Sequence, residues 1–479
     1  MNDFNSRVVS ATKWSAITEF LSKLITPILG LVLARLLTPE AFGVVATFTM
    51  IISLADIFAD AGFQKYIVQH EFRDEENLAN NATVAFWSNQ TLAFFIWFII
   101  TIFRDSLAEM VGSPGCGMAL SVACFSIPLI GFSSIQTAIF KRNLNFKALF
   151  RVGVISSIVP LLVTIPLAVI LRNYWALVIG TLAKNIINVI VLIYISDWKP
   201  SFFYSFRLLK EMLSFSMWSM IETFSIWLNQ YVDVFFVGTL LTQYYLGLYK
   251  TSITIIGQVL GIVTAIVTPV IFSSLSRLQN DDASFKHLFY RFQNIVAIIV
   301  LPLGAIIYSY SDVITFLVLG EQWLEASFFI GIWAASSSFS IATTRYCSEI
   351  YRAKGRPKLC FLSQILHLVV LAPGVYYSIQ WGFVSLCYFR AFVVLELVFV
   401  NFVISSYCFK ITAVEILKNI TEPLLYSLLL VAISFVLKSM NDHYILQMVY
   451  ILISLGLYSL LILKTEENRL LVKHYLLRK

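Results

Sequence analysis

Apolar runs of about twenty residues recur along the whole chain, and they constrain its fold more than any other feature. A helix needs about twenty mostly apolar residues to cross the hydrocarbon core of a bilayer. The sequence therefore predicts an all-α polytopic membrane protein. Its spans, about fourteen in number, are expected near residues 12–35, 41–62, 82–103, 117–140, 148–171, 174–196, 211–238, 244–273, 288–310, 324–351, 359–379, 382–407, 421–438 and 444–463. Prolines inside these segments predict kinks at Pro160, Pro166, Pro302 and Pro373.

The composition excludes an ordinary water-soluble protein. Hydrophobic residues make up 59% of the chain and charged residues only 13%, whereas a globular domain is roughly half apolar and about a quarter charged. The six cysteines have no paired spacing and the five histidines form no zinc-binding pattern, so we expect neither a metal site nor a cofactor. The chain also has no GxxxxGK[ST] phosphate loop, so we expect an ion gradient rather than a nucleotide to supply energy.

Lysine and arginine are distributed unevenly between alternate connections. With the N-terminus placed in the cytoplasm, the inside segments hold 25 of the 34 basic residues, the outside segments hold four, and five lie within spans. Positive residues favour the cytoplasmic side, so both termini are predicted to be cytoplasmic. The net charge of +7 is then explained by contact with anionic lipid headgroups, and no nucleic-acid partner is expected.

Two parts of the chain repeat each other. Residues 13–52 align without a gap to residues 217–256, and twelve of the forty aligned positions are identical. Chance would give roughly three or four in a chain dominated by a few residue types. The alignment retains an LLT turn and the glycine five residues after its threonine, which favours duplication over biased composition.

The duplication predicts two lobes that run in the same direction through the membrane, because six spans separate the copies. The lobes should then be related by a pseudo-two-fold axis along the membrane normal, as in transporters built from parallel repeats. We expect a six-helix N-lobe at residues 1–198, a six-helix C-lobe at 199–410, and two further helices and a tail at 411–479. A cleft between rocking lobes would give alternating access, which is the design of a transporter.

Several stretches resemble the polysaccharide-transport (Wzx-type) flippases of the multidrug/oligosaccharidyl-lipid/polysaccharide exporter superfamily. They are "ATKWSAI", "GVVATFTMIISLADIFADAGFQKYIVQ", "KRNLNFKALFR", "VTPVIFSSLSRLQ", "LGEQW" and "YRAKGRPK". The resemblance covers nearly the whole chain and implies two six-helix lobes, here with two extra C-terminal helices, around a central cavity.

The same resemblance implies an activity. A flippase of this kind moves undecaprenyl-diphosphate-linked oligosaccharide repeat units from the cytoplasmic to the periplasmic leaflet of the bacterial inner membrane, for O-antigen, capsule or exopolysaccharide assembly. The implied partners are this lipid-linked oligosaccharide, membrane lipids, a polysaccharide polymerase and a chain-length regulator. The sugar and the coupling ion stay open.

Cations inside the predicted spans are candidates for contact with an anionic substrate, because an ionisable group in mid-membrane is costly unless it is paired or hydrated. They are Lys23, Lys184, Lys250, Arg345 and Arg390. Arginine holds phosphate through two hydrogen bonds and stays charged when desolvated, so Arg345 and Arg390 are the preferred phosphate contacts. The alternative is an internal ion pair for each, Arg345 with Glu349 and Arg390 with Glu396.

Acids inside or near the spans are candidates for binding a coupling proton or sodium ion. They are Glu19, Asp56, Glu222, Asp233 and Glu349. Glu19, Lys23 and Asp56 should lie at similar depths, counting about 1.5 Å per residue. They form either a functional cluster or a structural salt bridge. Asp233 and Lys250 are also predicted to pair, while His367 stands alone and is expected to be a hydrogen-bonded structural group rather than a proton relay.

Three other functions are open on sequence grounds. A multidrug exporter of the same superfamily would share the architecture. A membrane polysaccharide polymerase or glycosyltransferase would be an enzyme, but no connection is long enough to hold an active site or carries a DxD-type pair. A scaffold for a synthesis complex would have no reason to bury charges. We therefore expect a transporter and not an enzyme.

Overall fold

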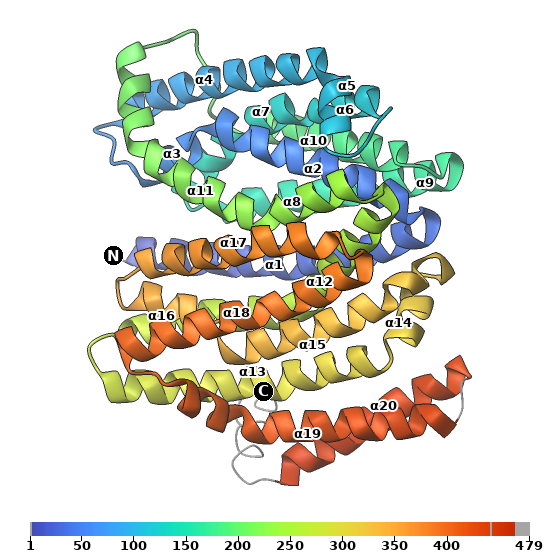
Figure 1. The fold of residues 1–479 in the computed structure, drawn as a ribbon. Helices are drawn as coiled ribbons and strands as arrows, with labels where there is room; N and C mark the ends of the chain where they lie inside the picture. Colours follow the sequence, from blue (N-terminus) through green and yellow to red (C-terminus); the bar gives the residue numbers. More distant parts are fainter. Residues whose placement is uncertain (1, 441–442, 465–479) are drawn as a thin grey trace. The chain divides into compact units, whose positions relative to one another are not determined.

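The computed structural model describes residues 2–440 and 443–464, and each regular element in these ranges is helical (Figure 1). The chain divides into two compact units, residues 1–250 and 251–479. The prediction of an all-α protein is therefore confirmed for the described residues.

The first unit contains α1 to α11 and the start of α12. α4 packs against α7, α10 packs against α7 and α8, and α11 packs against α2, α3 and α4. The bounds are α1 (Asn2–Leu36), α2 (Pro39–Asp60), α3 (Phe63–Gln69), α4 (Glu75–Ile102), α5 (Arg104–Met110), α6 (Gly117–Cys124), α7 (Ser126–Arg142), α8 (Phe146–Val159), the π-helical turn η1 (Pro160–Thr164), α9 (Ile165–Leu171), α10 (Trp175–Ile195) and α11 (Phe206–Leu240).

The second unit contains the rest of α12 and all later helices. α13 packs against α15 and α19, α18 packs against α15 and α17, and α19 packs against α20. The bounds are α12 (Gln243–Arg277), α13 (Asp282–Ser309), α14 (Ser311–Val318), the 3-10 turn η2 (Glu321–Ala326), α15 (Ser327–Thr343), α16 (Cys347–Ala353), α17 (Lys358–Ile379), α18 (Phe383–Phe409), α19 (Ala413–Met440) and α20 (Tyr444–Lys464).

The predicted spans all fall on helices. Eleven segments of the described chain are long and apolar enough to cross a membrane. The other three predicted spans lie on α1, α11 and α20. The described apolar stretches of α1 and α20 are shorter than a full span, and the described residues of α11 contain no such stretch. The chain is therefore a multi-pass membrane protein with about eleven spans that length and composition alone support.

Three helices begin well before their apolar runs, because polar residues cap them. Asp74 accepts a backbone N–H at the start of α4, and Asp281 accepts two at the start of α13. Thr412 and Glu415 cap each other before α19: the Thr412 hydroxyl accepts the Glu415 N–H at 3.2 Å, and the Glu415 carboxylate accepts the Thr412 N–H at 3.0 Å. A capping residue satisfies N–H groups that have no partner within the helix. Hydropathy alone therefore placed these helix starts too late.

Two of the four prolines coincide with a helix interruption. Pro160 begins the π-helical turn that separates α8 from α9, and Pro166 lies in the first turn of α9. A proline removes one backbone donor and crowds the preceding turn, which favours such an interruption. α13 and α17 continue as α-helix through Pro302 and Pro373.

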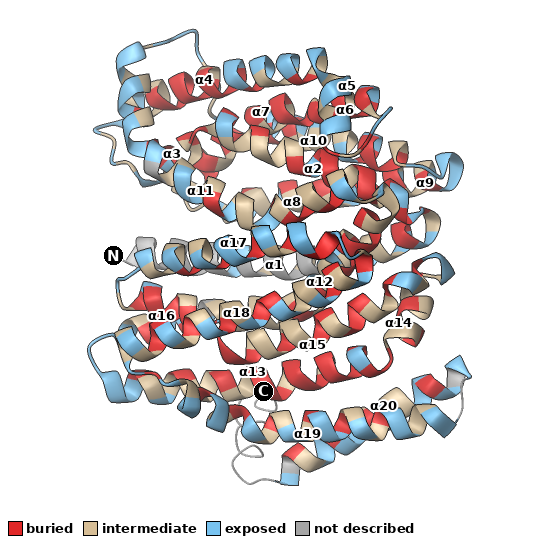
Figure 2. Ribbon diagram, viewed as in Figure 1, coloured by how far each residue is buried: buried red, intermediate tan, exposed pale blue. Residues whose placement is uncertain are grey.

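The burial pattern fits a protein surrounded by lipid. Large apolar side chains are exposed on many helices, as on α10, where Ile186 is 42% and Ile190 is 54% exposed. Exposed and buried residues alternate along the helices in Figure 2. Some amide side chains are buried and hydrogen-bonded instead, such as Gln293, which is 2% exposed. In a bilayer, polar groups must find partners inside the protein while apolar groups can face acyl chains.

The two copies of the LLT turn contact each other within the first unit. A Cβ added at Gly43 would overlap the backbone oxygen of Gln243, and a Cβ added at Gly247 would overlap the backbone oxygen of Pro39. In the repeat alignment Gly43 corresponds to Gly247 and Pro39 to Gln243, so the contact is reciprocal. Reciprocal contacts of this kind are produced by a local two-fold relation. The two glycines are needed because only a residue without a side chain allows backbones to approach so closely.

Candidate substrate and coupling site

Arg345 lies at a break in the helical segment 321–353. α15 ends at Thr343 and α16 begins at Cys347, so Arg345 stands between two helices rather than within one. The residue is exposed, and it forms no ion pair with any other described residue. An arginine with this freedom, inside a membrane-spanning segment, can bind an anion with both of its guanidinium edges.

A buried amide network holds the break in place. The Gln293 side chain on α13 donates hydrogen bonds to the carbonyl oxygens of Ala342 at 3.1 Å and Thr343 at 3.3 Å. The Asn419 side chain on α19 donates to the Gln293 side-chain oxygen at 3.2 Å. The last carbonyls of a helix have no partner inside it, so Gln293 satisfies two groups that the end of α15 exposes. Sequence reasoning missed both amides, although an amide inside an apolar run was the available signal.

Glu349 pairs with Arg352 and not with Arg345. Its carboxylate lies 3.2 Å from an Arg352 guanidinium nitrogen, and the Glu349 side chain is only 9% exposed. The predicted alternative, an Arg345–Glu349 pair, is wrong because the helix is interrupted between the two residues. Glu349 and Arg352 lie three apart in α16, where they share a face.

Arg390 does not pair with Glu396, so that predicted alternative is also wrong. The Arg390 guanidinium lies 4.9 Å from the centre of the Trp333 ring. Glu396 instead meets His367 of α17, with its carboxylate 2.8 Å from Nδ1 of the imidazole. Residues six apart on a helix point about 120° away from one another, which separates Arg390 from Glu396. His367 is hydrogen-bonded, as expected, although the sequence did not reveal its partner.

Asp60 ends a chain of hydrogen bonds at the end of α2. Lys141 donates to the Gln64 side-chain oxygen at 2.9 Å, Gln64 donates to the Ser134 hydroxyl at 3.3 Å, and Ser134 donates to Asp60 at 3.0 Å. Asp56 lies one turn earlier on α2, is partly buried, and has no hydrogen bond or ion pair with any described residue. A partly buried carboxylate in this state can accept a cation.

Glu222 and Lys65 form an ion pair, with their charged atoms 3.7 Å apart. Both side chains are about half exposed, at 55% for Glu222 and 47% for Lys65. An exposed pair of this kind contributes little stability. The structure therefore places Glu222 at the surface of the first unit.

Asp233 is almost fully buried and accepts a hydrogen bond from the Tyr249 hydroxyl at 2.7 Å. Lys250 follows Tyr249 directly, and its ammonium lies 4.9 Å from the centre of the Tyr231 ring. The predicted proximity of Asp233 to this part of α12 is therefore found through Tyr249. An ion pair between Asp233 and Lys250 themselves stays a prediction.

Three further candidate residues complete the set. Lys184 is exposed on α10. The side chains of Glu19 and Lys23 lie outside the described residues, so their predicted cluster with Asp56 stays a prediction. Among the described residues no group of three or more histidine, cysteine, aspartate or glutamate side chains could hold a metal ion, and all six cysteines are free.

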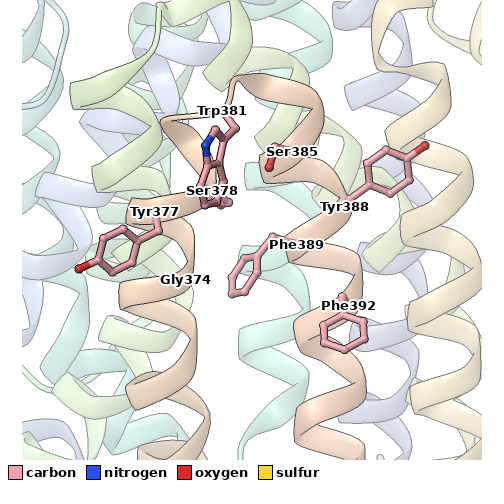
Figure 3. Close-up of a pocket in the computed structure, with 8 residues that line it drawn as sticks. All are labelled: Gly374, Tyr377, Ser378, Trp381, Ser385, Tyr388, Phe389 and Phe392. Carbon is pink, nitrogen blue, oxygen red and sulfur yellow. The ribbon is translucent and has the colours of Figure 1, made fainter.

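A groove of about 590 Å³ lies between α17 and α18, near the turn that joins them (Figure 3). Its lining is mainly aromatic: Gly374, Tyr377, Ser378, Trp381, Ser385, Tyr388, Phe389 and Phe392. Trp381 is 79% exposed and Phe392 is 68% exposed. Tryptophan and tyrosine favour the boundary between lipid and water, so this end of the hairpin fits a membrane interface.

The sequence profile of a family described as "Polysaccharide biosynthesis protein" matches residues 32–328, more than half of the chain. The chain belongs to this family. Among its relatives, the lipopolysaccharide biosynthesis protein WzxC of Escherichia coli (strain K12) is 22% identical over 325 residues, covering 66% of this chain and 64% of WzxC. The succinoglycan biosynthesis transport protein ExoT of Rhizobium meliloti (strain 1021) is 20% identical over 452 residues, covering 92% of this chain and 89% of ExoT.

This polysaccharide biosynthesis protein shares its fold with solved transporters. The lipid II flippase MurJ in an inward closed conformation matches with a TM-score of 0.74 and 14% identity, over 98% of this chain and 100% of that chain. An inward-facing multidrug MATE transporter matches with a TM-score of 0.61 and 16% identity, over 82% and 98%. At these identities the likeness shows the fold alone. The resemblance to Wzx-type transporters is confirmed, and ExoT, which matches 92% of this chain, is named as a transport protein rather than an enzyme.

Proposed function

We propose that this protein is a flippase. It moves undecaprenyl-diphosphate-linked oligosaccharide repeat units from the cytoplasmic to the periplasmic leaflet of a bacterial inner membrane. WzxC is named for lipopolysaccharide biosynthesis and ExoT for succinoglycan biosynthesis transport, and a putative O-antigen transporter of Shigella flexneri is 23% identical over 387 residues; these names support a surface polysaccharide as the product. The carrier lipid is supported by the resemblance to Wzx-type flippases and by a fold shared with a lipid II flippase. A polymerase and a chain-length regulator would receive the flipped unit.

The observation that carries this proposal is the free arginine at the break between α15 and α16. Arg345 is exposed and has no ion-pair partner among the described residues. A diphosphate offers the paired oxygens that a guanidinium binds best. Arg390, Lys184, Lys250 and Lys23 are the other proposed contacts of the anionic substrate.

The proposed architecture has fourteen transmembrane helices. Residues 1–198 form the N-lobe, residues 199–410 form the C-lobe, and residues 411–479 contribute two further helices and a cytoplasmic tail. The reciprocal contact of Gly43 with Gln243 and of Gly247 with Pro39 supports a pseudo-two-fold relation between the lobes. Both termini are cytoplasmic in this arrangement, so the two LLT turns meet on the periplasmic side.

Rocking of these lobes would drive alternating access, with an ion gradient as the energy source. Asp56 is the best supported coupling acid of the N-lobe, because its carboxylate has no described partner. Glu19, Glu222, Asp233 and Glu349 are the other candidates. Among them Glu222 is half exposed and Glu349 is already paired with Arg352, which makes both weaker candidates.

A multidrug exporter would have the same fold, as the MATE match illustrates. The family match and the names of the relatives favour the polysaccharide function. The two functions differ in what accumulates when the protein is lost.

The test is a deletion strain analysed for lipid-linked oligosaccharides. We expect undecaprenyl-diphosphate-linked repeat units to accumulate on the cytoplasmic leaflet and surface polysaccharide to be lost, with both restored by the intact gene. Normal surface polysaccharide without such accumulation would reject the flippase function. Increased sensitivity to cationic drugs alone would favour the multidrug exporter.

A further inference from the structure

His367 and Glu396 form an ionisable pair between two membrane-spanning helices. The Nδ1 atom of His367 on α17 lies 2.8 Å from a carboxylate oxygen of Glu396 on α18. The His367 side chain is 8% exposed and the Glu396 side chain is 20% exposed. Glu396 is the midpoint of α18 (Phe383–Phe409), and His367 lies about 13 Å along α17 from its first residue, at 1.5 Å per residue. The pair is therefore placed well inside the bilayer.

The neighbouring charges have other partners or lie near helix ends. α15, which packs on α18, has no ionisable side chain. α17 and α18 themselves carry Lys358 and Arg390 as further charged residues. The other elements packed against them are α16, with Glu349 and Arg352, and α19, with Glu415, Lys418, Glu422 and Lys438. Within the described part of the chain, Glu396 has no ion-pair partner other than His367.

This arrangement gives the pair a net charge that depends on one proton. An ionised carboxylate only accepts hydrogen bonds, so a neutral His367 must carry its hydrogen on Nδ1 and leave the Nε2 lone pair free. The pair then has a charge of about −1, which is costly in a low-dielectric interior. Addition of one proton from water forms an N–H bond at Nε2 and brings the net charge to zero. The reverse step breaks that bond and returns the proton to water.

The donor set favours a proton over a sodium ion. Sodium, like other hard cations, is held by several oxygen atoms, whereas this pair offers one carboxylate beside a nitrogen base. Histidine is the side chain whose charge changes between about pH 5 and pH 8. Glu396 is also the more accessible partner, and the aromatic groove of Figure 3 reaches Phe392, one helical turn away on α18.

We propose that His367 and Glu396 form a proton-binding site that couples export to the proton gradient. The pair binds one proton per transport cycle and releases it on the other side of the membrane. This inference rests on the proposed flippase function only for its coupling step, where it assigns the coupled proton to this pair instead of Asp56 and replaces the purely structural role expected for His367. Proton binding by the pair is independent of the substrate.

The first experiment measures proton uptake by the purified full-length protein without substrate. The pH is lowered from about 8 to about 5, and the protons bound are counted with a pH-sensitive dye. We expect the wild type to take up about one proton per chain more than the double variant His367→Gln/Glu396→Gln. Ser363→Ala is the control, since Ser363 is a buried polar residue of α17 that bonds within its own helix. Equal uptake by the wild type and a folded double variant would overturn the proposal.

The second experiment uses proteoliposomes loaded with the host's own undecaprenyl-diphosphate-linked oligosaccharide. A gradient of about one pH unit biases the proton occupancy of the site about tenfold, so it should accelerate transport by the wild type and by Ser363→Ala. The double variant should transport equally with and without the gradient. Retained stimulation in the double variant would overturn the coupling step. If the wild type transports nothing, the flippase function fails while the uptake experiment still decides whether the pair binds a proton.

Discussion

At the scale of single residues, Arg345 and Arg390 occupy different environments although the sequence ranked them together. Arg390 lies against the Trp333 ring, whereas Arg345 stands at a helix break and is exposed. A guanidinium on an aromatic face is partly satisfied by the ring electrons. Arg345 therefore has more of its hydrogen-bonding capacity free for a substrate.

Replacement of Arg345 by alanine should reduce export about 10- to 100-fold, the expected loss of hydrogen bonds to a charged group. Arg345→Lys should retain part of the activity, because lysine keeps the charge but binds phosphate as a single point. Export is measured as surface polysaccharide against equal amounts of inserted protein. The control is Arg207→Ala, since Arg207 is an exposed arginine paired with Glu211 at the start of α11. Wild-type export by a well-expressed Arg345→Ala would show that Arg345 is not a substrate contact.

At the scale of elements, the break between α15 and α16 depends on two helices that lie far away in the sequence. Gln293 from α13 binds the last carbonyls of α15, and Asn419 from α19 binds Gln293. Although α19 lies outside the predicted six-helix lobes, it supports the position of Arg345 through Gln293. This gives the penultimate helix a physical role that its apolar sequence does not suggest.

Gln293→Met should loosen this break, because methionine has a similar length but cannot donate a hydrogen bond. Leaving buried carbonyls unsatisfied costs about 1–3 kcal/mol, so we expect a lower melting temperature and faster amide exchange at residues 344–347. Ser309→Ala removes another buried polar group of α13 and serves as the control. Unchanged exchange at residues 344–347 in Gln293→Met would contradict the role of the amide.

At the scale of the whole molecule, the internal repeat has a structural counterpart in the two LLT turns. Gly43 contacts Gln243 while its equivalent Gly247 contacts Pro39, which is the equivalent of Gln243. Both contacts therefore depend on the same close approach of the two turns within the first unit.

The reciprocal contact can be tested by a double-mutant cycle. Gly43→Ala and Gly247→Ala should each lower the free energy of unfolding by about 1–3 kcal/mol, because each added methyl group meets a backbone oxygen. The loss in the double variant should be smaller than the sum of the two single losses by about 0.5–3 kcal/mol, since turns already pushed apart accommodate the second methyl group.

The matched control for this cycle is Gly257→Ala on α12, where an added Cβ would meet no atom within 4 Å. Stability is measured by thermal unfolding in detergent. Additive costs would mean that the two glycines act independently, and the absence of any cost would mean that the turns do not pack as described.

The sequence by itself determined the membrane class, the helical fold and the location of eleven of the predicted spans, because the bilayer demands long apolar helices and leaves few alternatives. The repeat and the family resemblance were also readable from the residues. The helix starts at Asp74 and Asp281 were not, since capping extends a helix into polar sequence that hydropathy excludes.

Only the tertiary structure decided which charges meet. Helical spacing predicted Arg345 with Glu349, but an interruption that Gln293 stabilises from another helix separated them. His367 looked solitary because Glu396 lies on the next helix. Contacts within a helix follow from sequence spacing, whereas contacts between helices depend on rotation, depth and packing, which only the folded chain fixes.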